Sequence, residues 1–149
     1  MAKRILVPLD QSAVAEFIVP IVADTARGAG ATVRLLHVAP EPENRIDEHG
    51  RVIAYTDQEM ARLEAEGLDY LRTVEARLDG AQVECAVRFG DPVTEILEEA
   101  GVWGADLIAV CTAGRSAASR IALGSVAEQV FRKAEPPVLL LRPDRWSLA

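Results

Sequence analysis

Residues 105–126 read ADLIAVCTAGRSAASRIALGSV, and this stretch decides the fold class. Its apolar run, 107–110, is short and rich in branched side chains, which is typical of a strand buried on both faces of a parallel sheet. A loop of small residues follows, and a helical pattern begins after residue 124. A strand, a small-residue loop and a new helix favour an anion site, because the first N–H groups of a helix have no intrahelical partner.

Four residues of this stretch suit a phosphate group. Gly114 and Gly124 allow the backbone to approach a ligand without interference from a Cβ atom. Ser125 can act both as the N-cap of the helix and as a hydroxyl donor. Arg115 follows Gly114 directly and is a better phosphate candidate than Arg120. The stretch therefore predicts a phosphate-binding loop.

The rest of the chain repeats the alternation of strand and helix, which predicts a doubly wound parallel α/β sheet with right-handed crossovers and helices on both faces. Pro20 lies inside the first helical pattern and is expected to kink it or to break a hydrogen bond locally. The expected strands are 3–9, 32–38, 82–88, 107–110 and 138–141, and the expected helices are 13–26, 57–78, 93–100 and 125–134.

The longest irregular stretch is 39–56, which has two prolines, Gly50 and many charged residues. A connection of this length inside a compact domain is usually functional or mobile. Its place after the second strand predicts either a lid or specificity element beside the ligand site, or a solvated crossover.

Asp10 follows the first strand, at the edge where open α/β sheets keep their ligand crevices. The same residue, or Ser12, is a candidate N-cap for the next helix. Asp91 and Pro92 similarly predict the start of the helix that follows the third strand.

The spacing Gly114, nine residues, Gly124-Ser125 resembles the nucleotide-binding signature of the universal stress protein family. That signature reads Gly, two residues, Gly, nine residues, Gly-Ser/Thr, and Cys111 stands at its first glycine. The segments ILVPLD, LLHVAP, FGDPVTEIL, GADLIAV and PPVLLLRP extend the resemblance over essentially the whole chain. It implies one domain over residues 1–149, an adenine-nucleotide α-hydrolase-like fold and the strand order 3-2-1-4-5.

The resemblance also implies a binding site for ATP, with Mg²⁺. Asp10 and Val38 would hold the adenosine, and the phosphates would lie against Gly114, Arg115, Gly124, Ser125 and Val126. Pro8, Leu9 and Cys111 belong to the same expected site. A homodimer through strand Val138–Leu141 is also implied, and such a dimer would cover an apolar edge strand.

A second hypothesis is a dimeric interaction module from the branch of the family that binds no nucleotide. Cys111 in place of the first glycine favours it, as does Gln11 where the family often has glycine, because each side chain adds bulk near the expected ligand. A cyclic nucleotide is a third alternative. Nothing in the sequence is poised to activate water, so the nucleotide hypothesis describes a sensor with at most slow ATP hydrolysis.

Composition limits the partners. A net charge of −7 over 149 residues argues against nucleic-acid binding, because no basic patch offsets that field. No apolar run reaches membrane-spanning length and no signal peptide is apparent, so a cytoplasmic location is expected. Cys85 and Cys111 fall on strands three steps apart in the expected sheet, too far for a disulfide. His37 has no metal-ligating or catalytic neighbour in sequence and is expected to be structural.

Overall fold

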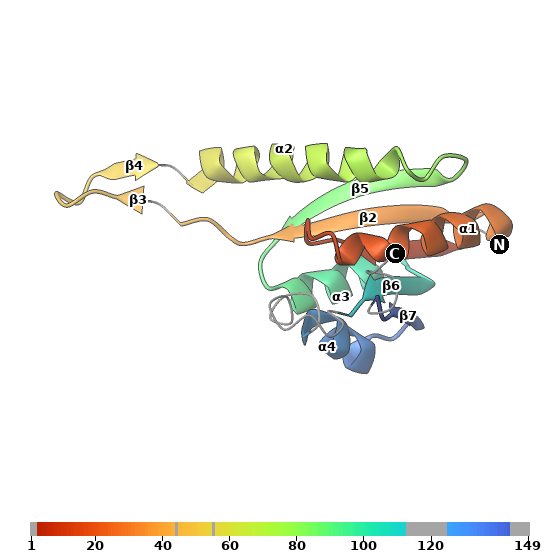
Figure 1. Cartoon of the computed structure of the whole chain (residues 1–149). Helices are drawn as coiled ribbons and strands as arrows, with labels where there is room; N and C mark the ends of the chain where they lie inside the picture. The colour runs from red at the N-terminus through yellow and green to blue at the C-terminus, as the bar shows by residue number, and fades with distance from the viewer. Residues whose placement is uncertain (1–2, 44, 55, 113–124, 144–149) are drawn as a thin grey trace.

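The computed structural model describes residues 3–43, 45–54, 56–112 and 125–143. Its main sheet has five parallel strands in the order β5-β2-β1-β6-β7, which confirms the predicted order 3-2-1-4-5 (Figure 1). These strands are β1 (Arg4–Pro8), β2 (Thr32–Ala39), β5 (Gln82–Phe89), β6 (Leu107–Cys111) and β7 (Val138–Leu141). The helices are η1 (Ala15–Ile18), α1 (Val19–Ala29), α2 (Thr56–Glu75), α3 (Pro92–Trp103) and α4 (Ser125–Lys133).

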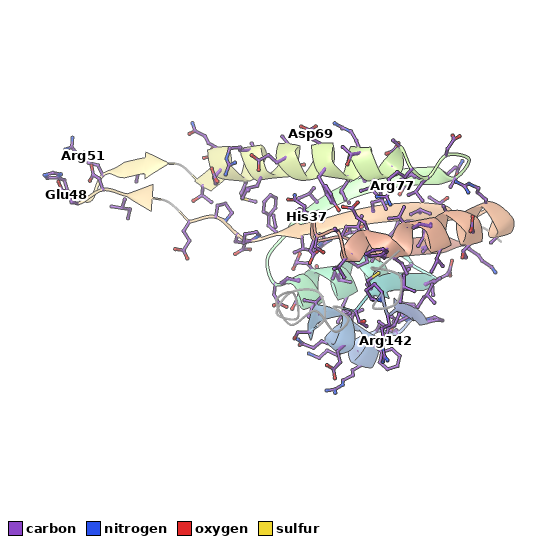
Figure 2. The ribbon with its side chains drawn as sticks, viewed as in Figure 1. His37, Glu48, Arg51, Asp69, Arg77 and Arg142 are labelled. Atoms are coloured by element: carbon purple, nitrogen blue, oxygen red, sulfur yellow. The ribbon has the colours of Figure 1, made fainter. Side chains whose placement is uncertain are left out.

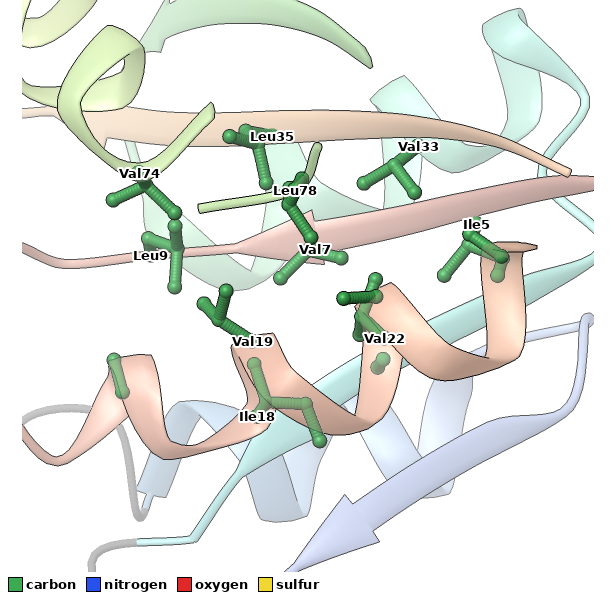
Figure 3. Close-up of a cluster of buried hydrophobic side chains, with 14 of the residues drawn as sticks. Ile5, Val7, Leu9, Ile18, Val19, Val22, Val33, Leu35, Val74 and Leu78 are labelled. Carbon is green, nitrogen blue, oxygen red and sulfur yellow. The ribbon is translucent and has the colours of Figure 1, made fainter. Parts of the chain in front are cut away.

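One face of the sheet is covered by η1, α1 and α2. Alternate strand residues such as Val7 and Leu35 point to this side, because successive side chains of a strand face opposite ways. They pack against Val22 of α1 and Val74 of α2 in a single buried cluster (Figure 3). This cluster is the larger part of the core and packs η1, α1 and α2 against the sheet.

The opposite face is covered by α3 and α4. The intervening strand residues, including Leu6 and Ile108, pack there against Ile96 and Trp103 of α3 and Val130 of α4. Both faces of the central strands are therefore buried, which explains why their sequences are almost continuously apolar.

The first helical segment differs from the prediction at Pro20. The structure divides it into the 3₁₀ helix η1 and the α-helix α1, and Pro20 lies in the first turn of α1. A proline is tolerated there because the N–H groups of a first turn have no intrahelical acceptor. Pro20, the second residue of α1, lies where the 3₁₀ helix changes to an α-helix, so the helical bonding pattern changes at this point, and α1 ends at left-handed Gly30.

Residues 39–56 also differ from the prediction of an irregular stretch, since they contain the two short antiparallel strands β3 (Arg45–Ile46) and β4 (Val52–Ala54). The Asp47 side chain organises the turn by accepting hydrogen bonds from the N–H groups of His49 and Arg51. The hairpin projects away from the sheet, with Glu48 and Arg51 at its far end (Figure 2). Strands of two and three residues are too short to show a periodic pattern in sequence.

Among the described residues, none of the helices combines the length and the apolar composition that a membrane span requires.

Candidate functional site

A cavity of about 110 Å³ lies at the carboxyl ends of β1 and β2, on the face covered by α3 and α4. Its walls come from four elements or their flanks, and Asp10 contributes the only ionisable side chain among them. The lining residues are Pro8, Leu9, Asp10, Leu36, Val38, Pro92, Ile96 and Val126.

The position of this cavity follows from the sheet order. The chain leaves β1 toward helices on one face, and the chain between β6 and β7 forms α4 on the other face. The two connections separate at the carboxyl ends of β1 and β6, and a crevice opens there. Ligand sites of open α/β sheets form at such a switch point.

Asp10 has two roles in the structure. It lines the cavity, and its Oδ1 atom accepts hydrogen bonds from the Ser12 backbone N–H at 3.0 Å and the Ser12 hydroxyl at 2.5 Å. The Ser12 hydroxyl in turn accepts a bond from the N–H of Ala15, the first residue of η1. Asp10 therefore holds the loop after β1 in place while its carboxylate borders the cavity.

Gln11, the next residue, has a φ of +70° and is exposed. A residue other than glycine adopts this left-handed conformation at a cost, because its Cβ crowds the backbone. The turn that follows β1 therefore requires a conformation that glycine would adopt freely.

His37 is held by the neighbouring strand. Its Nδ1 atom lies 3.0 Å from the carbonyl oxygen of Leu9, and its ring meets that of Tyr70 edge-on, with 6.4 Å between the ring centroids. Within the described residues no group of three or more His, Cys, Asp or Glu side chains could hold a metal ion. These contacts agree with a structural role for His37.

The phosphate side of the expected site is only partly described. Ser125 is exposed at the first position of α4, and Val126 in the same turn lines the cavity. The first turn of α4 therefore borders the cavity and can offer unpaired N–H groups. Gly114, Arg115 and Gly124 lie outside the described residues.

Cys111 ends β6, but its side chain belongs to the other face of the sheet. It is fully buried in the cluster that contains Ile18 and Val22, and it is not among the residues that line the cavity. Burial raises the pKa of its thiol to about 12. Cys111 is thus a core residue, and its side chain does not narrow the cavity.

The first turn of α3 forms one wall of the cavity. The sequence predicts where this helix begins but not that it borders the cavity. Asp91 caps this helix by accepting bonds from the Thr94 N–H and hydroxyl, as predicted, and Pro92 follows in the first turn. Ile96 lies four residues further along and shares a face with Pro92. Leu36 is two residues before Val38 and faces the same side of β2.

Pro92, Ile96 and Leu36 were not among the predicted site residues. Three signals in the sequence could have identified them. The Gly-Asp-Pro segment contains Pro92, the helical periodicity places Ile96 on the same face, and the alternation along the strand places Leu36 on the same side as Val38.

The chain belongs to the universal stress protein family, since the family model matches residues 1–142. Universal stress protein MJ0577 of Methanocaldococcus jannaschii is 28% identical over 155 residues, which covers 95% of this chain and 96% of the relative. Universal stress protein MJ0531 of the same organism is 36% identical over 85 residues, or 56% of this chain. That match spans only 50% of the relative.

Solved structures agree with the assignment. The structure of MJ0577 superposes with a TM-score of 0.77 at 30% identity, and the match covers 95% of this chain and 96% of that one. A universal stress protein in complex with cAMP superposes with a TM-score of 0.68 at 21% identity, covering 95% and 97%. The second likeness shows a shared fold.

Proposed function

We propose that the cavity receives the adenosine part of a nucleotide, with ATP as the ligand. One observation carries the proposal: five residues expected to bind nucleotide, from three separate parts of the chain, line a single cavity. They are Pro8, Leu9, Asp10, Val38 and Val126. Apolar walls suit the faces of a purine, and a carboxylate at the edge suits hydroxyl or amino donors of the nucleoside.

The phosphates would then lie toward the first turn of α4. Ser125 and the N–H groups beside it offer donors and partial positive charge. Gly114, Arg115 and Gly124 complete this part of the site on the basis of their spacing in sequence. Mg²⁺ would be held chiefly by phosphate oxygens, as is usual for this ion in nucleotide sites.

The position of Cys111 favours the nucleotide hypothesis over the module that binds none. That alternative is based on two side chains, Cys111 and Gln11, as bulk near the ligand. The Cys111 side chain is buried on the α1 face of the sheet, so only Gln11 still favours the alternative. A universal stress protein has been solved in complex with cAMP. We therefore include cAMP as an alternative ligand for the same cavity.

Isothermal titration of nucleotide-stripped protein with ATP and MgCl₂ tests the proposal. Gly124→Asp would place a negative charge against the phosphates and is expected to abolish binding. Gly101→Asp is the matched control, because it introduces the same charge at an open position of α3, about 13 Å along the helix from its first turn. Absence of heat with ATP, ADP, AMP and cAMP on folded protein would reject the proposal.

We further propose that the chain forms an isologous dimer through β7, which lies at one edge of the sheet with Leu140 exposed. The N–H groups of Ile108 and Thr112 donate to the carbonyls of Pro137 and Leu141. Because bonding direction alternates along a strand, the backbone groups of Leu140 point to the free edge.

Leu140→Pro would remove one outward N–H and leave the bonds to β6 in place. It is expected to give a folded monomer in light-scattering chromatography. A variant that remained dimeric would place the interface elsewhere.

In this proposal the protein is a one-domain, cytoplasmic stress-response sensor that changes its state with bound nucleotide. Its turnover of ATP is expected to be slow at most.

A further inference from the structure

Three carboxylates of α3 surround one arginine of β5. The Arg88 guanidinium lies 2.9 Å from Glu95, 3.4 Å from Glu98 and 2.9 Å from Glu99. The side chains of Arg88, Glu95 and Glu99 are at least three-quarters shielded from solvent. These contacts tie the face of α3 to the end of the sheet.

This cluster borders the proposed nucleotide cavity. Arg88 pairs in register with Val38, which lines the cavity from β2. Glu95 directly precedes Ile96, which lines the cavity from α3. The ion pair between Arg88 and Glu95 therefore joins the two walls from just outside the cavity.

The loop between β5 and α3 is packed against the same pair. Gly90 has a φ of +134°, and a Cβ at this position would lie 3.3 Å from Cγ of Glu95. The Gly90 N–H donates to the carbonyl of Ala39, one residue after Val38 in β2. The loop, the end of β2 and the first turn of α3 thus form one closely packed unit.

We propose that Arg88 and Glu95 are a positioning pair for the nucleotide cavity, because their ion pair sets the separation of Val38 and Ile96 across it. The inference rests on the proposed function of that cavity. Neither residue lines the cavity, so each would act on the ligand through the wall that it holds.

A second ion pair in the same network provides a matched control. Arg34 of β2 bonds to Glu84 at 2.6 Å and to Glu99 at 2.5 Å. Arg34 and Arg88 therefore each supply one bond to Glu99. Arg34 lies two residues before Leu36, a cavity residue of β2, and four before Val38, which are about 7 Å and about 13 Å along the strand. Removing Arg34 disturbs the same network, through Glu84 and Glu99, but leaves the ion pair between Arg88 and Glu95 in place.

The test compares Arg88→Met and Glu95→Gln with Arg34→Met and Glu84→Gln. Each variant is titrated with ATP and MgCl₂, and its stability is measured by urea unfolding. Arg88→Met and Glu95→Gln are expected to raise the Kd roughly tenfold, within the range of coupling seen between contacting residues. Arg34→Met should lower stability to a similar degree as Arg88→Met but change the Kd less than about twofold.

Two outcomes would overturn the inference: an unchanged Kd in Arg88→Met, or equal rises in Kd for the two arginine variants. Hydrogen exchange of the ligand-free protein separates this inference from the proposed function. If the wild type binds no nucleotide, the proposed function fails. Faster exchange of the hydrogen-bonded amides at residues 96–99 of α3 for Arg88→Met alone would then still support its positioning role, and unchanged exchange would reject it.

Discussion

Gly67 of α2 lies directly over His37 of β2: a Cβ atom at Gly67 would be 3.2 Å from Cδ2 of that ring and 2.9 Å from Cγ2 of Val87. The helix therefore approaches the sheet more closely than a side chain at this position allows. His37 in turn contacts the carbonyl of Leu9, beside the cavity. Because Gly67 has no side chain, α2 can pack directly on His37, and His37 holds the end of β1 from the face opposite the cavity.

Gly67→Ala is expected to destabilise the protein by about 1–3 kcal/mol, because the added methyl group overpacks a stiff valine and a bonded ring. Gly101→Ala is the control. Its Cβ would enter open space, so the higher helix propensity of alanine should stabilise the protein by about 0.5–1 kcal/mol. Urea unfolding of both variants measures the two effects, and two changes of the same sign would contradict the prediction.

Gln11→Gly is expected to stabilise the protein by about 1 kcal/mol, because the left-handed backbone at this position costs glycine little. Ala65→Gly, at an exposed position in the interior of α2, should lower stability by a similar amount, since glycine is a poor helix former. Thermal and urea unfolding check both substitutions. A destabilised Gln11→Gly would mean that the side chain of Gln11 contributes more than its backbone strain costs.

The sheet could be predicted because its strands are buried on both faces and their apolar runs stand out between polar loops. The division of the first helix into η1 and α1 was not predicted, because the apolar helical pattern continues across the boundary between them. The turn built by the Asp47 side chain was missed because its strands are too short for any periodicity. In both places the difference lies in the local backbone conformation, which the apolar pattern does not determine.

The candidate site was predictable to the extent that it depends on strand ends. Asp10 follows from its position at the end of β1, whereas Val38 and Val126 were implied by the family resemblance. Ile96 could not be identified in this way, because its place in the cavity depends on how α3 is held against β5. The ion pairs of Arg88 that hold α3 join residues 7 to 11 positions apart, and only the fold brings them together.

Both cysteines are expected to resist thiol reagents in the native protein. Burial, followed by a hydrogen bond to Glu75, raises the pKa of Cys85 to about 12, and burial raises that of Cys111 to about 12. A thiol of this pKa is ionised to roughly one part in ten thousand at pH 8, and the thiolate is the reactive form.

Labelling with a chromogenic disulfide should therefore release two equivalents only after unfolding in urea. Cys85→Ser should leave one equivalent, from Cys111. In the native state this thiol should react more slowly than the Cys85 thiol of the wild type, because Cys111 is fully buried. Cys85 is only partly buried, so rapid reaction of its thiol in native buffer would contradict its raised pKa. Rapid reaction of Cys111 would contradict its full burial.

Glu99 should make stability depend on pH in the acid range. Burial would raise the pKa of this carboxyl, but hydrogen bonds from Arg34 and Arg88 outweigh burial and hold the pKa below its usual value. A depressed pKa in the folded state means that the ionised form stabilises the fold fully above the unfolded pKa of about 4.3. This contribution is lost as the pH falls through the lower, folded pKa.

Glu99→Gln is the variant that tests this dependence, because it keeps the size of the side chain and removes the ionisation. The wild type should be more stable than Glu99→Gln at pH 7, and the difference in unfolding free energy should shrink below about pH 4. Glu64→Gln, at an exposed position of α2, should show little difference at any pH. A stability difference for Glu99→Gln that stayed constant from pH 6 to pH 3 would show that the two arginines do not depress its pKa.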